Sequence, residues 1–287
     1  MAPVSPSTPD RLVDGVVVIN LDHRPERLER FSHNAAAYAS LRNWERIPAV
    51  NGQHLPGYGQ KPWFRDGTRD KGWAGRAGCT LSHRQAIATA KARGWHRVLI
   101  LEDDVEFGPH FDQELQALMQ ALEDRAAGWH LCFLGVSKPV GPGRPLASLA
   151  EGQQLFELFG CIGAFAYVVQ SELYDWVLER LPEPAGIWPW IARHRAIDRW
   201  YARNLTPHFK LTAVSPSLVG HYTSFSDIGQ RAGAIISKDA AHADHSQPIV
   251  PCSALFFAVS RLWLRFIFIS ANPINRIRGW LKQRRGF

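Results

Sequence analysis

The sequence predicts an α/β protein with a mostly parallel sheet flanked by helices. Short runs of β-branched and aliphatic residues recur along the chain, and segments with helical spacing separate them. The first fifty residues already give the order strand, helix, strand. One apolar run, 98–101, ends directly in three adjacent carboxylates. In an open α/β sheet, the carboxyl ends of the strands are where ligands bind.

The first elements follow from local signals. Residues 15–21 predict a strand, and Asp22 is placed to cap a helix that runs to about residue 39. A second strand is expected over 44–50. Residues 53–78 are rich in Gly, Pro, Trp and Lys and lack periodicity. They predict a long loop that either covers a ligand or packs on itself.

The middle of the chain begins with a helix over 80–93 that Thr80 is expected to cap. His83, Ile87 and Ala90 fall on one face of this helix by their spacing. The other predicted elements are a strand through 98–101, a helix over 111–125, a strand over 129–135, a loop over 137–152, a strand over 159–170, helices over 171–181 and 197–204, and a strand over 209–218.

Composition indicates an ordinary globular protein, because 46% of the 287 residues are hydrophobic and 21% are charged. The four cysteines form no CxxC pair, which favours a reducing compartment. The amino terminus lacks the pattern of a secretory signal. We expect a flexible start over 1–13, one domain over 14–250, and a distinct tail over 251–287.

The excess of positive over negative charge lies in the tail. Residues 251–287 hold seven of the 33 Lys and Arg residues and none of the 26 acidic residues, so the rest of the chain is neutral. The net charge of +7 is therefore a property of the tail, and it does not indicate a nucleic-acid groove on the domain.

The tail itself has an amphipathic pattern. Residues 255–269 are strongly apolar, but two arginines interrupt a run that is too short for a comfortable membrane span. A break is expected at Pro273. The two basic pieces, with Trp263 and Trp280, predict an interfacial anchor at an anionic membrane. The alternative is a helix packed against the domain.

The carboxylate triplet Glu102, Asp103 and Asp104 is the strongest chemical signal. Three adjacent acids repel one another unless a cation or shared protons offset the charge. If the strand continued, Glu102 and Asp104 would share a face and Asp103 would take the other. Such a pair suits a hard divalent ion that carries a diphosphate. The alternative for an isolated triplet is a solvated acidic turn.

Five blocks of the chain resemble those of glycosyltransferase family 25, which includes bacterial lipooligosaccharide galactosyltransferases and collagen-modifying galactosyltransferases. The blocks are similar to the family patterns INLDRRPER, GCxxSH, LEDDV, GTxGY and VD, and they lie at residues 17–27, 77–83, 101–105, 163–167 and 197–198. Their order and spacing agree over roughly residues 14–230. Ala164 and Ala166 replace the usual Thr and Gly of the fourth block.

The resemblance implies a GT-A-like, Rossmann-like fold, a UDP-sugar donor and a divalent ion, Mn²⁺ or Mg²⁺. Asp104 is the first candidate for a metal ligand. Glu102, which can alternatively hold a ligand water or the donor ribose, and His221 are the further candidates. Asp103 is expected to orient neighbouring groups, and the roles within the triplet can be permuted. A metal that bridges the phosphates would stabilise the charge on the leaving diphosphate.

Asp198 is the candidate base that takes the proton of the acceptor hydroxyl, and its alternative role is to cap a helix. Ser82 and His83 are expected to open a helix whose N-terminus favours anions. Arg24 and Arg27 follow the first strand and meet either the nucleotide or solvent. The residues expected to bind the donor are Asn20, Arg24, Arg27, Ser82, His83, Glu102 and Asp103.

These expectations combine into one function. The chain is expected to be a metal-dependent inverting glycosyltransferase that transfers a hexose, galactose or glucose, to a lipopolysaccharide-type or other surface glycan. We expect it in the cytoplasm, at the inner face of the plasma membrane. The alternatives are a metal-dependent phosphohydrolase and a non-catalytic relative that binds a sugar nucleotide or a membrane.

Overall fold

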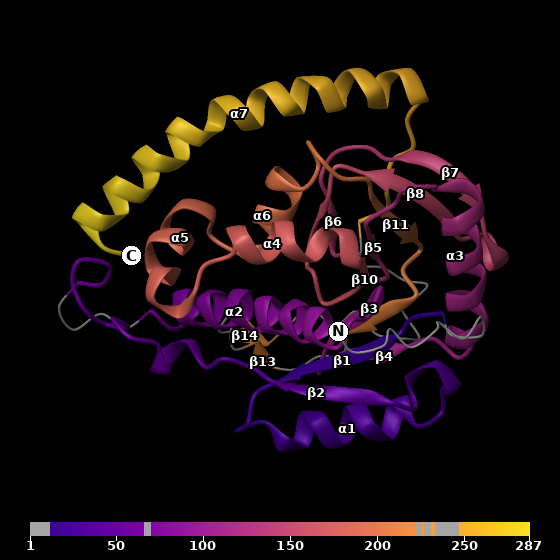
Figure 1. The fold of residues 1–287 in the computed structure, drawn as a ribbon, viewed down its shortest axis with the longest axis horizontal. Helices are drawn as coiled ribbons and strands as arrows, with labels where there is room; N and C mark the ends of the chain where they lie inside the picture. The colour runs from indigo at the N-terminus through magenta and orange to yellow at the C-terminus, as the bar shows by residue number, and fades with distance from the viewer. Residues whose placement is uncertain (1–11, 66–69, 222–224, 227–230, 233–246) are drawn as a thin grey trace.

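The computed structural model describes residues 12–65, 70–221, 225–226, 231–232 and 247–287 (Figure 1). Eight strands form the central sheet: β1 (Gly15–Asn20), β2 (Trp44–Pro48), β3 (Arg97–Glu102), β5 (Leu131–Phe133), β7 (Arg144–Ser148), β8 (Gln154–Leu158), β10 (Ala166–Gln170) and β11 (Leu211–Ser215). The α-helices are α1 (Pro25–Ala35), α2 (Lys71–Ala92), α3 (Phe111–Arg125), α4 (Tyr174–Arg180), α5 (Ile187–His194), α6 (Ile197–Asn204) and α7 (Ala254–Arg285). Short strands pair outside this sheet: β4 (Val105–Phe107) with β12 (Val219–His221), β6 (Lys138–Pro139) with β9 (Cys161–Ile162), and β13 (Phe225–Ser226) with β14 (Arg231–Ala232).

The sheet has the strand order β2-β1-β3-β10-β5-β11-β8-β7. β1 is parallel to β2 and β3, and β5 is parallel to β11. β10 runs antiparallel to both of its neighbours, and so does β8. Six of the eight strands therefore point in one direction. The predicted α/β architecture is confirmed, as a mixed sheet.

Helices cover both faces of this sheet, so its inner strands are apolar on both sides. All six residues of β1 are buried. Val17 and Ile19 pack in a core with α2, α4, α5 and α6, whereas Val16 and Val18 face α1 and α3. A strand buried on both faces gives an uninterrupted apolar run in the sequence, which explains why β1 and β3 were predictable.

Helix α2 begins well before the predicted start at Thr80. Asp70 caps it by accepting hydrogen bonds from the backbone N–H groups of Gly72 and Trp73. The hydroxyl of Thr80 instead donates to a carbonyl one turn earlier. The glycines in this stretch allow close packing rather than a loop, because a Cβ on Gly78 would lie 2.2 Å from the carbonyl oxygen of Val50.

Three further expectations about secondary structure were wrong. Arg24, not Asp22, occupies the N-cap position of α1, and Asp22 forms an ion pair with Arg46. The predicted loop over 137–152 contains the edge strand β7, and the strand β8 beside it was not predicted. Helix α5 was also missed.

Helix α7 is continuous through Pro273, but its segments 254–267 and 272–285 are inclined by 46°. In the described part of the chain no single helix is long and apolar enough to span a membrane. The two inclined segments of α7 together have the length and the composition for it. One side of α7 packs on the domain: the ring of Phe257 stacks on Phe159 at 4.3 Å. At its end, Phe287 packs against the rings of Trp63, Phe64 and Trp73.

Candidate active site

A cavity of about 120 Å³ lies at the carboxyl ends of β1, β2 and β3, among the described residues. This is the edge at which parallel strands present ligand-binding groups. One stripe of α2 forms a wall, and the segment 49–53 after β2 forms another. The polar residues that line the cavity are His23, Arg27, Asn51, Gln53, Lys71, Ser82, His83, Glu102, Asp103 and Asp104.

The carboxylate triplet lies in this cavity, but it does not follow the predicted alternation. Strand β3 ends at Glu102, and Asp103 and Asp104 form a turn before β4. The change of direction brings all three side chains to the cavity wall. The expectation that Asp103 faces away was wrong, because the strand geometry on which it relied stops one residue earlier.

Asp103 is buried and held by two side chains. Asn20 Nδ2 donates to Asp103 Oδ2 at 2.6 Å, and Arg27 Nη1 donates to Asp103 Oδ1 at 3.1 Å. Burial and the neighbouring charge of Asp104 raise the pKa of Asp103 to about 6, although Arg27 and Asn20 oppose this shift. Asp103 therefore orients Asn20 and Arg27.

Asp104 has a buried carboxylate oxygen that accepts no hydrogen bond. Its Oδ2 lies 3.5 Å from Arg27 Nη1, but its buried Oδ1 has no hydrogen-bond partner. His221 Nδ1 lies 3.7 Å from that oxygen, an ion-pair distance and too long for a hydrogen bond. Burial would raise the pKa of Asp104, but His221 and Arg27 hold it below its ordinary value. Asp104 is therefore an anion at neutral pH.

His221 reaches the triplet through local strand pairing. Strand β12 pairs with β4, so that His221 lies opposite Val105, the residue after Asp104. Its ring packs on Phe165 at 3.8 Å between centroids. Burial lowers the pKa of His221, but the carboxylates of Asp104 and Glu102 more than compensate and raise it. The sequence also predicts that Asp227, in the same late segment as His221, closes over the donor; this residue lies outside the described residues.

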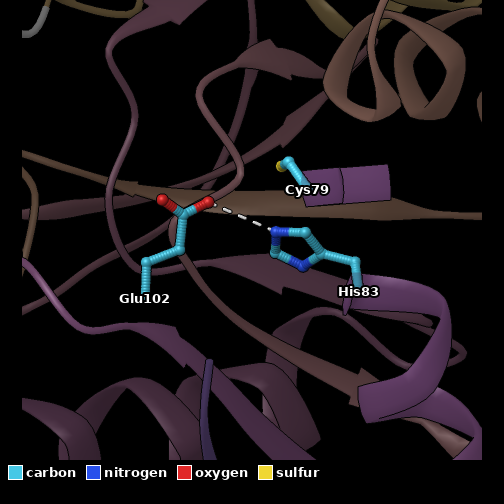
Figure 2. A group of neighbouring side chains, drawn as sticks. All are labelled: Cys79, His83 and Glu102. Carbon is cyan, nitrogen blue, oxygen red and sulfur yellow. Dashed lines mark hydrogen bonds and ion pairs between the residues drawn. The ribbon is translucent and has the colours of Figure 1, made fainter. Parts of the chain in front are cut away.

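Glu102 belongs to a second group, with His83 and Cys79 (Figure 2). His83 Nε2 lies 3.2 Å from Glu102 Oε1, and its Nδ1 lies 2.9 Å from the hydroxyl of Tyr167. The donor atoms of Cys79, His83 and Glu102 all lie within 4.8 Å of one another. Sequence reasoning missed Cys79, although its spacing of four residues from His83 places both on one helical face.

Of the residues expected to bind the donor, Ser82 and Asn20 make hydrogen bonds within the protein, and Arg24 lies outside the cavity wall. Ser82 Oγ donates to the carbonyl of Gly78 and accepts from the backbone N–H of Val50. The amide of Asn20 bridges Asp103 and the carbonyl of Arg24. Arg24 does not line the cavity. Because α2 starts at Lys71, the predicted anion-binding helix N-terminus at Ser82 and His83 was also wrong.

Asp198 lies beside the cavity rather than in its wall. Its Oδ2 accepts the N–H of Gly163 at 3.0 Å, and its Oδ1 accepts the N–H of Arg199. Ala196 occupies the N-cap position of α6, so Asp198 lies in the first turn and is not the cap residue. Burial raises the pKa of Cys79, and the charges of Glu102 and Asp198 raise it further. Asp198 is therefore within electrostatic range of the cavity.

The residues present fit a hard divalent cation at Asp104. A buried carboxylate oxygen without a partner costs free energy, and a cation would remove that cost. Carboxylate oxygens are ligands that Mn²⁺ and Mg²⁺ prefer. Glu102 and His221 are the neighbouring donors, although His83 also engages Glu102.

Comparison with known proteins shows what the chain is similar to. A model described as "Glycosyltransferase family 25 (LPS biosynthesis protein)" matches residues 14–133. This part of the chain is similar to glycosyltransferase family 25. The family 25 match covers less than half of the chain and includes the blocks that supply Arg27, His83 and the carboxylate triplet.

The chain is similar to longer family 25 proteins. It is 37% identical over 153 residues to the human "Inactive glycosyltransferase 25 family member 3", a match that covers 47% of this chain and 23% of the relative. It is 32% identical over 139 residues to "Procollagen galactosyltransferase 1-B" of Xenopus laevis, which covers 44% and 22%. The chain therefore matches less than a quarter of either relative.

Among solved structures, the crystal structure of A197 from STIV aligns with a TM-score of 0.39 and 11% identity. That alignment covers 83% of this chain and 95% of the other. A TM-score this low does not define a shared fold.

Proposed function

We propose that the chain is a metal-dependent inverting glycosyltransferase that transfers galactose or glucose from a UDP-sugar to a surface glycan of the lipopolysaccharide type. The match of residues 14–133 to the family 25 model supports the reaction class, and a similar procollagen galactosyltransferase supports the sugar. The observation that carries the proposal is the buried, unpartnered Oδ1 of Asp104 at the carboxyl edge of the sheet.

The side chains around the cavity have distinct roles in this proposal. Asp104 would hold the ion, with Glu102 and His221 as further donors, and the ion would offset the charge of the leaving diphosphate. Arg27 lines the cavity, and its guanidinium is fixed between Asp103 and Asp104. It is therefore placed to stabilise negative charge that develops on the diphosphate.

Inversion at the sugar requires a base on the acceptor side. Asp198 is the candidate, because it lies beside the cavity and its carboxylate is anchored by the backbone of Gly163. That anchor orients the carboxylate without neutralising it, as a general base requires. The fourth block, residues 163–167, thus holds two of the proposed site residues, Asp198 through Gly163 and Glu102 through Phe165, whose carbonyl accepts the N–H of Glu102 at 2.8 Å.

Donor binding is the first test of the proposal. Thermal unfolding of the full chain should shift upward with a UDP-sugar plus Mn²⁺, and much less with either alone, because ligands that bind only the native state stabilise it. Release of UDP should follow when an acceptor is added. If no nucleotide sugar shifts the transition and none is turned over, the proposal fails.

A second candidate is a non-catalytic sugar-nucleotide binder. The human relative that is 37% identical is named inactive. In addition, Ala164 and Ala166, which replace a Thr and a Gly of the family pattern, are both buried beside the site. This candidate predicts the same metal-dependent thermal shift without turnover of any donor, so the two measurements separate the candidates.

We also propose that α7 docks on the inner face of an anionic membrane. Nine of the ten large hydrophobic side chains that are 49–76% exposed in the described structure lie in α7: Leu255, Phe256, Val259, Leu262, Trp263, Phe266, Ile274, Ile277 and Trp280. The tail also carries seven cations and no acid. An apolar face bordered by Lys and Arg is typical of interfacial helices.

Trp263→Glu should weaken binding to phosphatidylglycerol vesicles by at least about tenfold, because it removes an exposed apolar ring that would insert into the membrane and adds a charge that the anionic lipids repel. Vesicle co-sedimentation measures the effect. Gln116→Glu, an exposed substitution of equal charge on α3, should leave partitioning unchanged. Equal binding of the Trp263→Glu variant and the wild type would contradict the anchor.

A further inference from the structure

Six cations gather outside the cavity, where α2, α5, α6 and α7 meet. α7 crosses α5, and α5 contacts both α2 and α6 (Figure 1). The members of this group, which we call the cation cluster, lie within electrostatic range of one another or share the ring of Trp73: Arg76, Arg195, Arg199, Arg203, Arg278 and Lys282. None of them lines the cavity.

The indole of Trp73 joins the two ends of the cluster. The guanidinium carbon of Arg76 lies 4.7 Å from the ring centroid, and the ammonium of Lys282 lies 5.2 Å from it. Helices α2 and α7, which are far apart in the sequence, thus bring their cations to the same ring. Arg195, between α5 and α6, has a φ of 75°, which is costly for a non-glycine residue.

The cluster has no paired acid. Within the described ranges, no carboxylate lies within 4.0 Å of the charged nitrogens of these six side chains. The two nearby acids are engaged elsewhere, since Asp70 caps α2 and Asp198 accepts two backbone N–H groups. The pKa of Arg203 is lowered by burial and then by its cationic neighbours, and that of Lys282 by burial and then by Arg195.

We propose that the cation cluster binds a phosphate group carried by the acceptor. Guanidinium groups form paired hydrogen bonds to phosphate oxygens, and several of them together compensate a doubly charged anion. The cluster lies next to Asp198, whose neighbour Arg199 is a member. This proposal rests on the proposed function in one respect, because Asp198 as the candidate base marks the side from which the acceptor approaches.

Two observations favour an acceptor phosphate over the donor diphosphate. The donor cavity is lined by residues 19–104 only and excludes all six cations. Moreover, Arg278 and Lys282 belong to α7, whose exposed apolar side includes Ile274, Ile277 and Trp280. A phosphorylated glycolipid would reach the cluster with its headgroup while its lipid part remained near that apolar side.

The test measures phosphate binding without turnover. Inorganic phosphate is titrated into the full chain by calorimetry, and vesicles of phosphatidylcholine with and without phosphatidic acid form a second arm. Arg199→Gln with Arg203→Gln should weaken binding of phosphate, or of phosphatidic acid, by at least about tenfold. Arg180→Gln, an exposed arginine of α4 outside the cluster, is the matched control.

Thermal unfolding separates binding from a structural role. Because the six cations repel one another, the double variant should unfold at the same temperature as the wild type or higher. A variant that binds less and unfolds no earlier supports the proposal, and the arm that loses binding identifies free or lipid phosphate. Unchanged binding in both arms, or lost binding that accompanies a lower unfolding temperature, overturns it. Asp104→Asn should leave phosphate binding intact, so failure of the proposed transferase function is a separate result.

Discussion

Replacing Asp104 by Asn is expected to lower Mn²⁺-dependent turnover of a UDP-sugar by about 100- to 1,000-fold. The change removes an anionic oxygen from the position where charge on the leaving diphosphate must be offset. The fold should survive, because Asp104 Oδ1 makes no hydrogen bond that the substitution would break. A coupled assay for released UDP measures the loss, and thermal unfolding with and without Mn²⁺ should show that the metal-dependent shift disappears as well.

Glu106→Gln is the matched control for that experiment. Glu106 lies two residues further on, in β4, and its carboxylate pairs with the exposed Arg30 at 2.9 Å. It does not line the cavity. Turnover of this variant should stay within a few-fold of the wild type. If Asp104→Asn retained turnover within tenfold of the wild type at saturating Mn²⁺, the assignment of Asp104 would be wrong.

Gly78→Ala is expected to cost about 2–3 kcal/mol of folding free energy, the range for overpacking a well-packed interior. The added Cβ would lie 2.2 Å from the carbonyl oxygen of Val50 and 2.9 Å from the backbone nitrogen of Gly52. Backbone atoms cannot rotate away, so α2 must separate from the segment that lines the cavity. Donor affinity should therefore fall together with stability.

Urea unfolding measures the cost of Gly78→Ala, and a thermal shift with UDP-sugar reports the cavity. Gly186→Ala is the control, because a Cβ there would lie 3.6 Å from its nearest atom, Pro182 Cβ, an ordinary contact. It should change the stability by no more than about 0.5 kcal/mol. A Gly78→Ala variant as stable as this control would contradict the close packing of α2 on residues 50–52.

Sequence patterns were sufficient where local and tertiary forces agree. The helix predicted over 111–125 is α3 with the same ends, and the apolar run through 98–101 is the buried strand β3. The location of the triplet at a cavity was also predictable, because the carboxyl ends of strands in an α/β sheet are where ligands bind. Local signals and packing lead to the same structure in these segments.

The misses arise where contacts between distant segments decide the structure. The beginning of α2 contains glycines that local propensity assigns to a loop, but they are required by the backbone of 50–52. The group of Cys79, His83 and Glu102 joins a helix to a strand end. The hydroxyl of Ser82 is likewise bound by a distant segment, since it accepts the backbone N–H of Val50, a contact that local spacing does not indicate. The catalytic and metal roles of individual residues stay predictions.

The division of the chain between cavity and cation cluster has a consequence for how specificity can diverge. Every residue that lines the cavity comes from positions 19–104, whereas five of the six clustered cations come from positions 195–282. The two sets share no residue, although α2 contributes to both. Exchange of residues 195–204 and 254–285 between relatives, which leaves His221 in place, would therefore retarget such an enzyme to a new acceptor while the donor pocket keeps its own packing, and chimeric chains would test how acceptor specificity evolves.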